Sequence, residues 1–141
     1  MNLETHSITV HTKGNSDLID ITGQVQSLIN RTGFYEGSAL VFAGGSTAGI
    51  TTIEFEPGLR KDYPKFWEKT VPSGITYNHD ETWHDGNGHS HIRASLQGAS
   101  FTVPFKNGHL LLGTWQQIVL IDFDNRSRTR EIIVQLTGIK R

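Results

Sequence analysis

The sequence contains no cysteine, which excludes disulfide bonds, thiolate metal ligands and cysteine nucleophiles. It also has no strong excess of charge, because 13 Lys and Arg residues and 14 Asp and Glu residues give a net charge of −1. A protein that binds nucleic acid mainly through its phosphates needs a basic face, so we expect no nucleic-acid partner. A small local phosphate site remains compatible with this balance. Any metal ion would be held by imidazole, carboxylate, amide or water.

The sequence has no apolar run long enough to span a bilayer, so we expect no membrane partner. Residues 1–6 are neither basic nor apolar enough for a secretion signal, and we therefore expect a cytoplasmic protein. A length of 141 residues suits one domain with a substantial core, and we take residues 1–141 as that single domain.

Most of the chain has the alternation and the β-branched composition of strands. The longest apolar stretch, 110–123, predicts one strand that bends near Gly113. The Asn107-Gly108 pair before it suits a tight hairpin turn, because both residues tolerate positive φ. In full, the predicted strands cover residues 7–12, 37–43, 50–55, 100–105, 110–123 and 130–137.

Two segments have the apolar period of a helix. The first covers residues 17–31 and ends at Gly33, and the second begins at Pro57, a favoured first-turn position. Residues 92–96 fit either a short helix that ends at Gly98 or a strand. The expected fold is therefore an α+β domain, a β-rich sheet or sandwich covered by two helices.

Residues 77–98 are polar and rich in histidine. Four of the seven histidines lie there, and the first half of the segment has almost no aliphatic side chain. Such a segment cannot form core structure, and its imidazoles and carboxylates titrate or bind metals near neutral pH. The histidines are His79, His84, His89 and His91, and the acidic residues are Asp80, Glu81 and Asp85.

The spacing of His89 and His91 allows a shared metal ion if the segment is extended, because residues two apart then face the same side. Imidazole nitrogens suit zinc and other first-row metals, and His79 could supply a third ligand. Three protein ligands would leave a position open for water or substrate, as in catalytic metal sites. If the segment is helical at His89, the two rings diverge. The alternative is a loop of solvated polar side chains.

Other polar residues could complete such a site. Asp80 and Asp85 could orient metal-bound imidazoles or transfer protons. The glycine-rich run 44–49 lacks the lysine of a P-loop and precedes a strand, so we expect a tight connection whose Thr47 could still face a ligand. Arg93 is a candidate anion contact near the histidines, although most such side chains are solvated.

Three motifs, at residues 86–98, 100–104 and 112–118, resemble those of the YjbQ-like family, whose members are often described as secondary thiamine-phosphate synthases. The resemblance extends from the first strand to the last, and His79, Asp80 and residues 87–91 match the polar motif of that family. It implies a compact α+β subunit in a homotrimer, with a histidine-lined pocket near a subunit boundary that is capable of binding a metal.

Gly45 departs from this resemblance. Many members of the family carry His-Thr-Thr-Ala where this sequence has Gly45-Ser46-Thr47-Ala48. One ligand or catalytic group of the common pattern is therefore missing. Either His84, His89 or water replaces it, or the activity differs.

With the resemblance, the histidine-rich segment predicts an enzyme that joins a pyrimidine diphosphate to a thiazole phosphate, or performs related phosphate-ester chemistry. A divalent metal, zinc or, with a phosphate substrate, magnesium, would stabilise the leaving group. The alternative is a non-catalytic homotrimer whose histidines bind a metal or ligand for structural reasons. The predicted metal ligands are His79, His89 and His91, the predicted catalytic residues are Asp80 and Asp85, and the predicted contacts to a small phosphorylated substrate are Asn87, Arg93 and Thr47.

Overall fold

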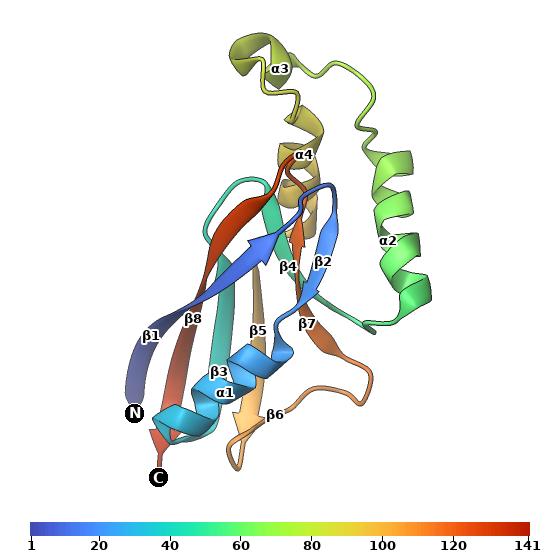
Figure 1. Cartoon of the computed structure of the whole chain (residues 1–141). Coiled ribbons are helices and arrows are strands. Elements are labelled where there is room, and N and C mark those ends of the chain that lie inside the picture. The colour runs from blue at the N-terminus through green and yellow to red at the C-terminus, as the bar shows by residue number, and fades with distance from the viewer.

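Two antiparallel sheets form the framework of the protein, and a computed structural model describes all residues, 1–141. The larger sheet has the strand order β1-β8-β3-β5-β6, and the smaller sheet has the order β2-β7-β4 (Figure 1). The strands are β1 (Asn2–Thr12), β2 (Asp17–Asp20), β3 (Phe34–Ala43), β4 (Ala48–Ile53), β5 (Ser100–Lys106), β6 (His109–Leu110), β7 (Gln117–Asp122) and β8 (Arg128–Lys140). The helices are α1 (Thr22–Thr32), α2 (Pro57–Thr70), α3 (Asn78–Trp83) and α4 (Gly88–Gln97).

The apolar residues of the central strand β7 divide between two cores. Ile118 and Leu120 pack against the larger sheet and α1, whereas Val119 and Ile121 pack against α2 and α4. Because β7 is covered on both faces, its sequence is a continuous apolar run rather than an alternating one. The molecule thus has three layers: the larger sheet, the smaller sheet, and the helices α2 and α4. The α+β, β-rich prediction is confirmed, but the structure has four helices rather than two.

The helix predicted over residues 17–31 begins only at Thr22. Residues 17–20 form β2, which pairs with β7 in the smaller sheet. Leu18 faces the helical layer and Ile19 packs toward the larger core, so these neighbours alternate as strand residues do. The predicted helix began too early because the adjacent apolar residues Leu18 and Ile19 fit the period of a helix as well as that of a strand. The predicted end of the helix is confirmed, since Gly33 adopts a left-handed φ of 77°.

The single strand predicted over residues 110–123 is wrong. The short β6 ends the larger sheet, whereas β7 is central in the smaller one. The connection between them is a turn in which the Gly113 amide donates to Gln116 Oε1 at 2.8 Å. Leu111 and Trp115 in this connection are 55% and 71% exposed, so their apolar character does not reflect burial in a strand.

The histidine-rich segment forms two short helices rather than an irregular loop. Helix α3 lies at the end of the molecule farthest from both termini, and α4 continues from it along the smaller sheet (Figure 1). Asp80 links the two helices, because its carboxylate accepts hydrogen bonds from the Tyr77 amide at 3.0 Å and from the Gly88 amide at 3.1 Å. Helix α4 ends at Gly98, as one of the two readings of residues 92–96 predicts. None of the helices has the length and apolar character needed to cross a membrane.

Gly88 determines how closely α3 approaches α4. A Cβ atom at this position would lie 2.5 Å from Tyr77 Cβ, a distance that real side chains do not tolerate. We therefore expect Gly88→Ala to lower the free energy of unfolding by about 1–3 kcal/mol. Gly23→Ala in α1 is the matched control, because a Cβ there meets nothing within 4 Å. Urea denaturation in which both variants are equally stable would contradict this close contact.

Candidate functional site

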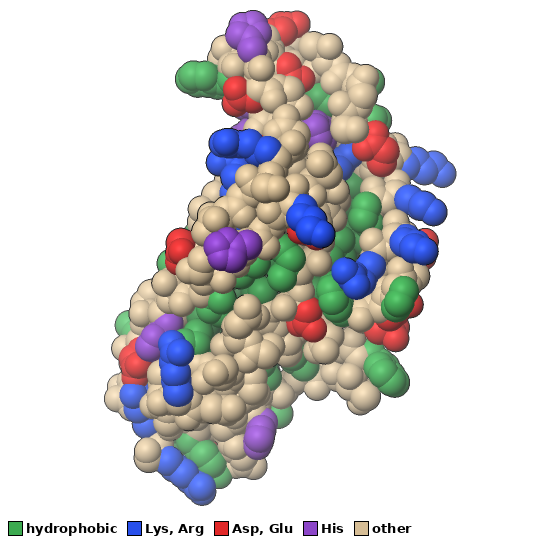
Figure 2. Space-filling view, in the orientation of Figure 1, with side chains coloured by type: hydrophobic (Ala, Val, Ile, Leu, Met, Phe, Trp, Pro, Cys, Tyr) green, Lys and Arg blue, Asp and Glu red, His purple; other side chains and the backbone are tan.

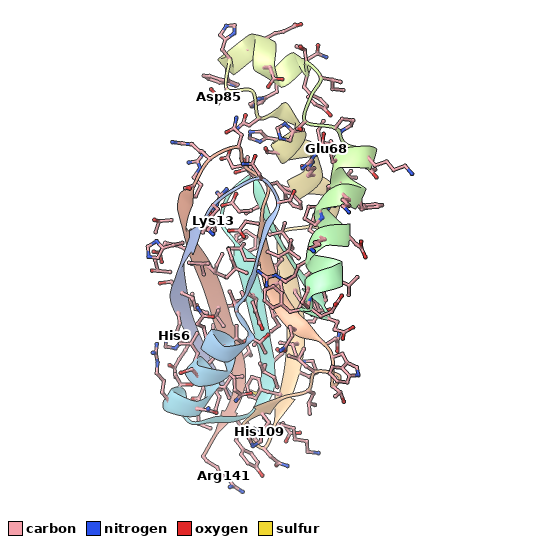
Figure 3. The ribbon with its side chains drawn as sticks, turned by 45° about the vertical axis from the view of Figure 1, so that its right-hand side comes forward. His6, Lys13, Glu68, Asp85, His109 and Arg141 are labelled. Atoms are coloured by element: carbon pink, nitrogen blue, oxygen red, sulfur yellow. The ribbon has the colours of Figure 1, made fainter.

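A polar pocket of about 330 Å³ lies where α3 and α4 meet the ends of β4 and β8. Asp85 marks the loop between α3 and α4 in Figure 3, at the edge of this pocket. Figure 2 shows Lys and Arg side chains beside histidines in this part of the molecule. The lining residues are Gly45, Ser46, Thr47, His79, Trp83, Asp85, Asn87, His91, Arg128 and Arg130.

Two fully buried carboxylates hold the arginines of this pocket. Asp122 accepts two hydrogen bonds from Arg130, each 2.8 Å long, and one from Thr12 Oγ1. Asp124 accepts from Arg128 Nε at 2.9 Å and Nη2 at 2.6 Å. Such charge-assisted bonds fix the plane and position of each guanidinium group.

Asp124 also connects the pocket walls. Its carboxylate accepts hydrogen bonds from Asn87 Nδ2 at 3.2 Å, Thr47 Oγ1 at 3.2 Å and the Asn125 amide at 2.8 Å. Burial acts to raise the pKa of Asp124, but the bonds from Asn125, Asn87 and Arg128 outweigh it and lower the pKa to about 2. The carboxylate is therefore charged at any pH near neutrality.

The ion pairs leave some guanidinium hydrogens unused. Arg130 donates from Nη2 to Thr47 Oγ1 at 2.7 Å, but its Nη1 group has no partner within the chain. That group lies beside Gly45, where a Cβ atom would be 3.1 Å from Nη1. The absence of a side chain at Gly45 thus leaves an anchored positive group open to the pocket.

His79 and His91 face one another across the α3–α4 junction, with their ring centroids 4.3 Å apart. Burial, followed by the neighbouring His79, lowers the pKa of His91, so its imidazole is neutral at pH 7. Two buried polar atoms here, His79 Nδ1 and Asn87 Oδ1, have no hydrogen-bond partner within the chain. Buried polar atoms normally have partners, so these two positions suit contacts with a ligand or water.

His89 lies outside this pocket, and the prediction that it shares a face with His91 is wrong. The segment is helical, and side chains two apart on a helix point in nearly opposite directions. His89 instead lies near Tyr77, with ring centroids 6.4 Å apart, and lines a separate hollow that includes Arg93. Within the single chain, no group of three or more histidines and carboxylates is placed to hold a metal ion.

Arg93 also lies on this opposite side of α4, away from the predicted substrate contacts. Its guanidinium donates to the Val71 carbonyl at 3.0 Å, to Ser16 Oγ at 3.1 Å and to Glu68 at 2.9 Å. Glu68 is on α2, whose upper end lies close to α4 (Figure 3). Arg93 therefore connects α4 to α2 and to the turn after β1, and its hydrogen bonds stabilise the fold.

The predicted site is thus divided by α4. Of the predicted site residues, His79, His91, Asp85, Asn87 and Thr47 line the pocket, whereas His89, Arg93 and Asp80 do not. The Tyr77 and Gly88 amides that hold Asp80 in place also lower the pKa of its carboxyl.

The four charged residues that build the pocket are not among the site residues predicted from the sequence. Their signal was available, since two acidic residues end an otherwise apolar strand and two arginines open the next one. Charged residues in such a run are rarely buried unless they are paired. These residues are Asp122, Asp124, Arg128 and Arg130.

Fold and pocket together define an α+β protein with a polar pocket lined by histidine and arginine. A family profile described as "UPF0047 protein YjbQ-like" matches residues 6–139, and the chain belongs to this YjbQ family. It is 39% identical over 128 residues to a UPF0047 protein of Archaeoglobus fulgidus, covering 91% of this chain and 97% of that one. A UPF0047 protein of Methanothermobacter thermautotrophicus is 38% identical, covering 98% of this chain and 94% of that one.

Solved structures support the same assignment. A YbjQ-like protein of unknown function from Sulfolobus solfataricus superposes with a TM-score of 0.88 at 29% identity, covering 98% of this chain and 100% of that chain. A hypothetical protein from Aeropyrum pernix gives a TM-score of 0.90 at 31% identity, covering 96% and 99%. The predicted family and its α+β fold are therefore confirmed.

The low pKa of Asp124 predicts that the free energy of unfolding depends on pH. Its pKa of about 2 lies below the ordinary 3.8, so the charged form contributes about 2 kcal/mol above pH 4, and this contribution is lost as the pH falls toward 2. We expect Asp124→Asn to lower the free energy of unfolding by about 2–4 kcal/mol at pH 7, since the variant also leaves Arg128 without its partner. We expect this difference in unfolding free energy between the variant and the wild type to narrow between pH 4 and pH 2.

Urea denaturation at several pH values measures this difference. Asp62→Asn on the exposed face of α2 is the control, and we expect it to behave as the wild type. If the difference in unfolding free energy between Asp124→Asn and the wild type stays constant from pH 7 to pH 2, the charge of Asp124 contributes nothing to stability.

Proposed function

We propose that the protein is an enzyme that acts on a small phosphorylated substrate bound in the pocket between α3, α4 and the ends of β4 and β8. One observation carries this proposal: Arg128 and Arg130 are anchored by buried carboxylates, yet still offer N–H groups to the pocket. Planar guanidinium groups match phosphate oxygens well. Anchoring them in advance reduces the cost of organising the site when an anion binds.

The more specific proposal is thiamine-phosphate synthesis, as the resemblance to the family suggests. In this reaction a thiazole nitrogen supplies the electron pair for a new C–N bond to the pyrimidine methylene carbon. The C–O bond to the diphosphate breaks, and pyrophosphate leaves with that electron pair. The thiazole nitrogen carries no proton to remove, so the main requirement is stabilisation of the negative charge that develops on pyrophosphate.

The residues of the pocket suit that requirement. The Nη1 groups of Arg128 and Arg130 would bind the phosphate oxygens, and Thr47 would orient Arg130. The neutral ring of His91 would donate a hydrogen bond from its N–H to the leaving oxygen and so stabilise the charge that develops there. Asn87, held by Asp124, would position the substrate through its free Oδ1. Asp85 also lines the pocket, where it would accept a hydrogen bond from the substrate.

A divalent metal, zinc or magnesium, stays a prediction for this pocket. The donor set of one chain does not fit the expected site, because His79 and His91 are the only two imidazoles that meet there. We therefore assign no step to a metal.

A homotrimer also stays a prediction. The outer face of the larger sheet gives it some support, because Leu40 and Phe42 on β3 are 36% and 41% exposed there and no helix covers them. An assembly would bury this apolar surface. The mass of the protein in solution tests the prediction, and a monomer would contradict it.

Arg130 offers the direct test of anion binding. We expect pyrophosphate to bind the wild type and to bind Arg130→Met at least tenfold more weakly, because the variant loses a charge-assisted contact. Arg126→Met is the matched control, since Arg126 is exposed in the turn before β8 and does not line the pocket. Isothermal titration calorimetry measures both affinities, and circular dichroism confirms that the variants are folded.

Arg130→Lys and His91→Gln extend this test to variants that disturb the fold less. We expect the lysine variant to retain part of the affinity. We expect His91→Gln to slow the release of pyrophosphate from a pyrimidine diphosphate and a thiazole phosphate by at least tenfold. Equal pyrophosphate binding by the wild type, Arg130→Met and Arg126→Met would refute the proposed anion site. Binding without turnover of these two substrates would refute the specific activity only.

The metal prediction has its own test. If the purified protein contains zinc, we expect His91→Ala to reduce the zinc content and His89→Ala to leave it unchanged, because His89 lies on the opposite side of α4. Elemental analysis of the three proteins measures this. Loss of zinc from His89→Ala would contradict the placement of His89 outside the pocket. Full retention of zinc in His91→Ala would show that His91 is not a zinc ligand.

A further inference from the structure

A second hollow of about 410 Å³ adjoins the charged pocket. The two hollows share Gly45, Ser46 and His91 as lining residues, so they lie side by side with His91 between them, and we call the pair the groove. We call the part with Arg128 and Arg130 the charged half, and the second hollow the small-residue half. The remaining residues of the small-residue half are Ala48, Ala94, Ser95, Gly98 and Ala99.

The two halves differ in chemistry. The small-residue half has no charged side chain, and three of its side chains are methyl groups. Short side chains leave room beside the backbone, and alanine methyl groups provide an apolar surface. Such a surface favours a flat, weakly polar group over an ion.

The small-residue half has a rigid wall. The Gly98 carbonyl accepts a hydrogen bond from the Ile50 amide at 3.1 Å, and the Ala99 carbonyl accepts one from the Ala43 amide at 2.8 Å. Gly49 lets the end of α4 approach β4, because a Cβ there would lie 2.8 Å from the Gly98 carbonyl oxygen. The space is therefore set by main-chain contacts and does not depend on the positions of long side chains.

An independent observation indicates that the groove takes a ligand. Asn87 lines the charged half, is only 5% exposed, and has an Oδ1 atom without any partner in the chain. The Nδ2 group of Asn87 donates to Asp124, so the side chain cannot rotate freely to bring Oδ1 to a donor. A buried acceptor held in this way is costly unless a bound molecule or water supplies a donor.

We propose that the groove binds a phosphate ester with a small ring, the phosphate in the charged half and the ring in the small-residue half. This inference rests on the proposed function and adds the orientation of the substrate. It places His91 beside the bond that joins ring and phosphate. Small side chains at residues 94, 95 and 99 then determine which rings the protein accepts.

Inorganic phosphate and phenyl phosphate are the two probes that test the division of the groove. We expect the wild type to bind phenyl phosphate at least tenfold more tightly than inorganic phosphate, because the ring buries apolar surface. Ser95 lines the small-residue half and is exposed, so Ser95→Leu fills that half without disturbing the core. This variant should lose most of the preference for phenyl phosphate and bind inorganic phosphate within about twofold of the wild type.

Two further variants serve as controls in the same calorimetric titrations. Ser127→Leu makes the same chemical change in an exposed turn outside the groove, and we expect it to retain the wild-type preference. Ser95→Val introduces a smaller side chain than Ser95→Leu, so this variant should lose less of the preference for phenyl phosphate.

The outcomes separate this inference from the proposed function. If both probes bind the wild type equally well, or if Ser95→Leu keeps the full preference, the ring does not occupy the small-residue half. The anion site would survive that result. If neither probe binds, the anion site itself is absent and both proposals fail.

Discussion

Two ion pairs built on buried carboxylates, Asp122 with Arg130 and Asp124 with Arg128, are the constraint on which the pocket depends. A carboxylate removed from water is strongly destabilised unless charged and polar partners surround it, and leaving one without its partner costs about 3–5 kcal/mol. Here the partners come from β1, the turn before β4, β8 and the residue that precedes α4. The same bonds that compensate for burial therefore hold the pocket walls in one arrangement.

This arrangement explains how positive groups are available in a chain of nearly neutral charge. Each arginine is neutralised by its carboxylate, yet keeps N–H groups directed at the pocket, so the protein presents donors without a basic surface. A net charge of −1 excluded a broad phosphate-binding face but left room for a local one. The pocket is local in that sense, since its donors converge on a volume of about 330 Å³.

The division of the histidines follows from one local choice of backbone conformation. An extended segment would place His89 and His91 on one side, and a helix places them on opposite sides of α4. The pocket thus contains two imidazoles rather than three, and His89 lines the separate hollow beside Arg93.

The sequence by itself determined the family, the α+β class, most of the strands and the glycine that ends α1, because these depend on short-range period and turn chemistry. It also located the segment that carries His79, Asn87 and His91. Only the tertiary structure decided that Leu18 belongs to a strand, that β6 and β7 lie in different sheets, and that Asp122 and Asp124 meet Arg128 and Arg130. The first two outcomes depend on which distant strands pair, and a local pattern does not contain that information. The third depends on how buried charges find partners, and the sequence indicates only that charged residues flank an apolar strand.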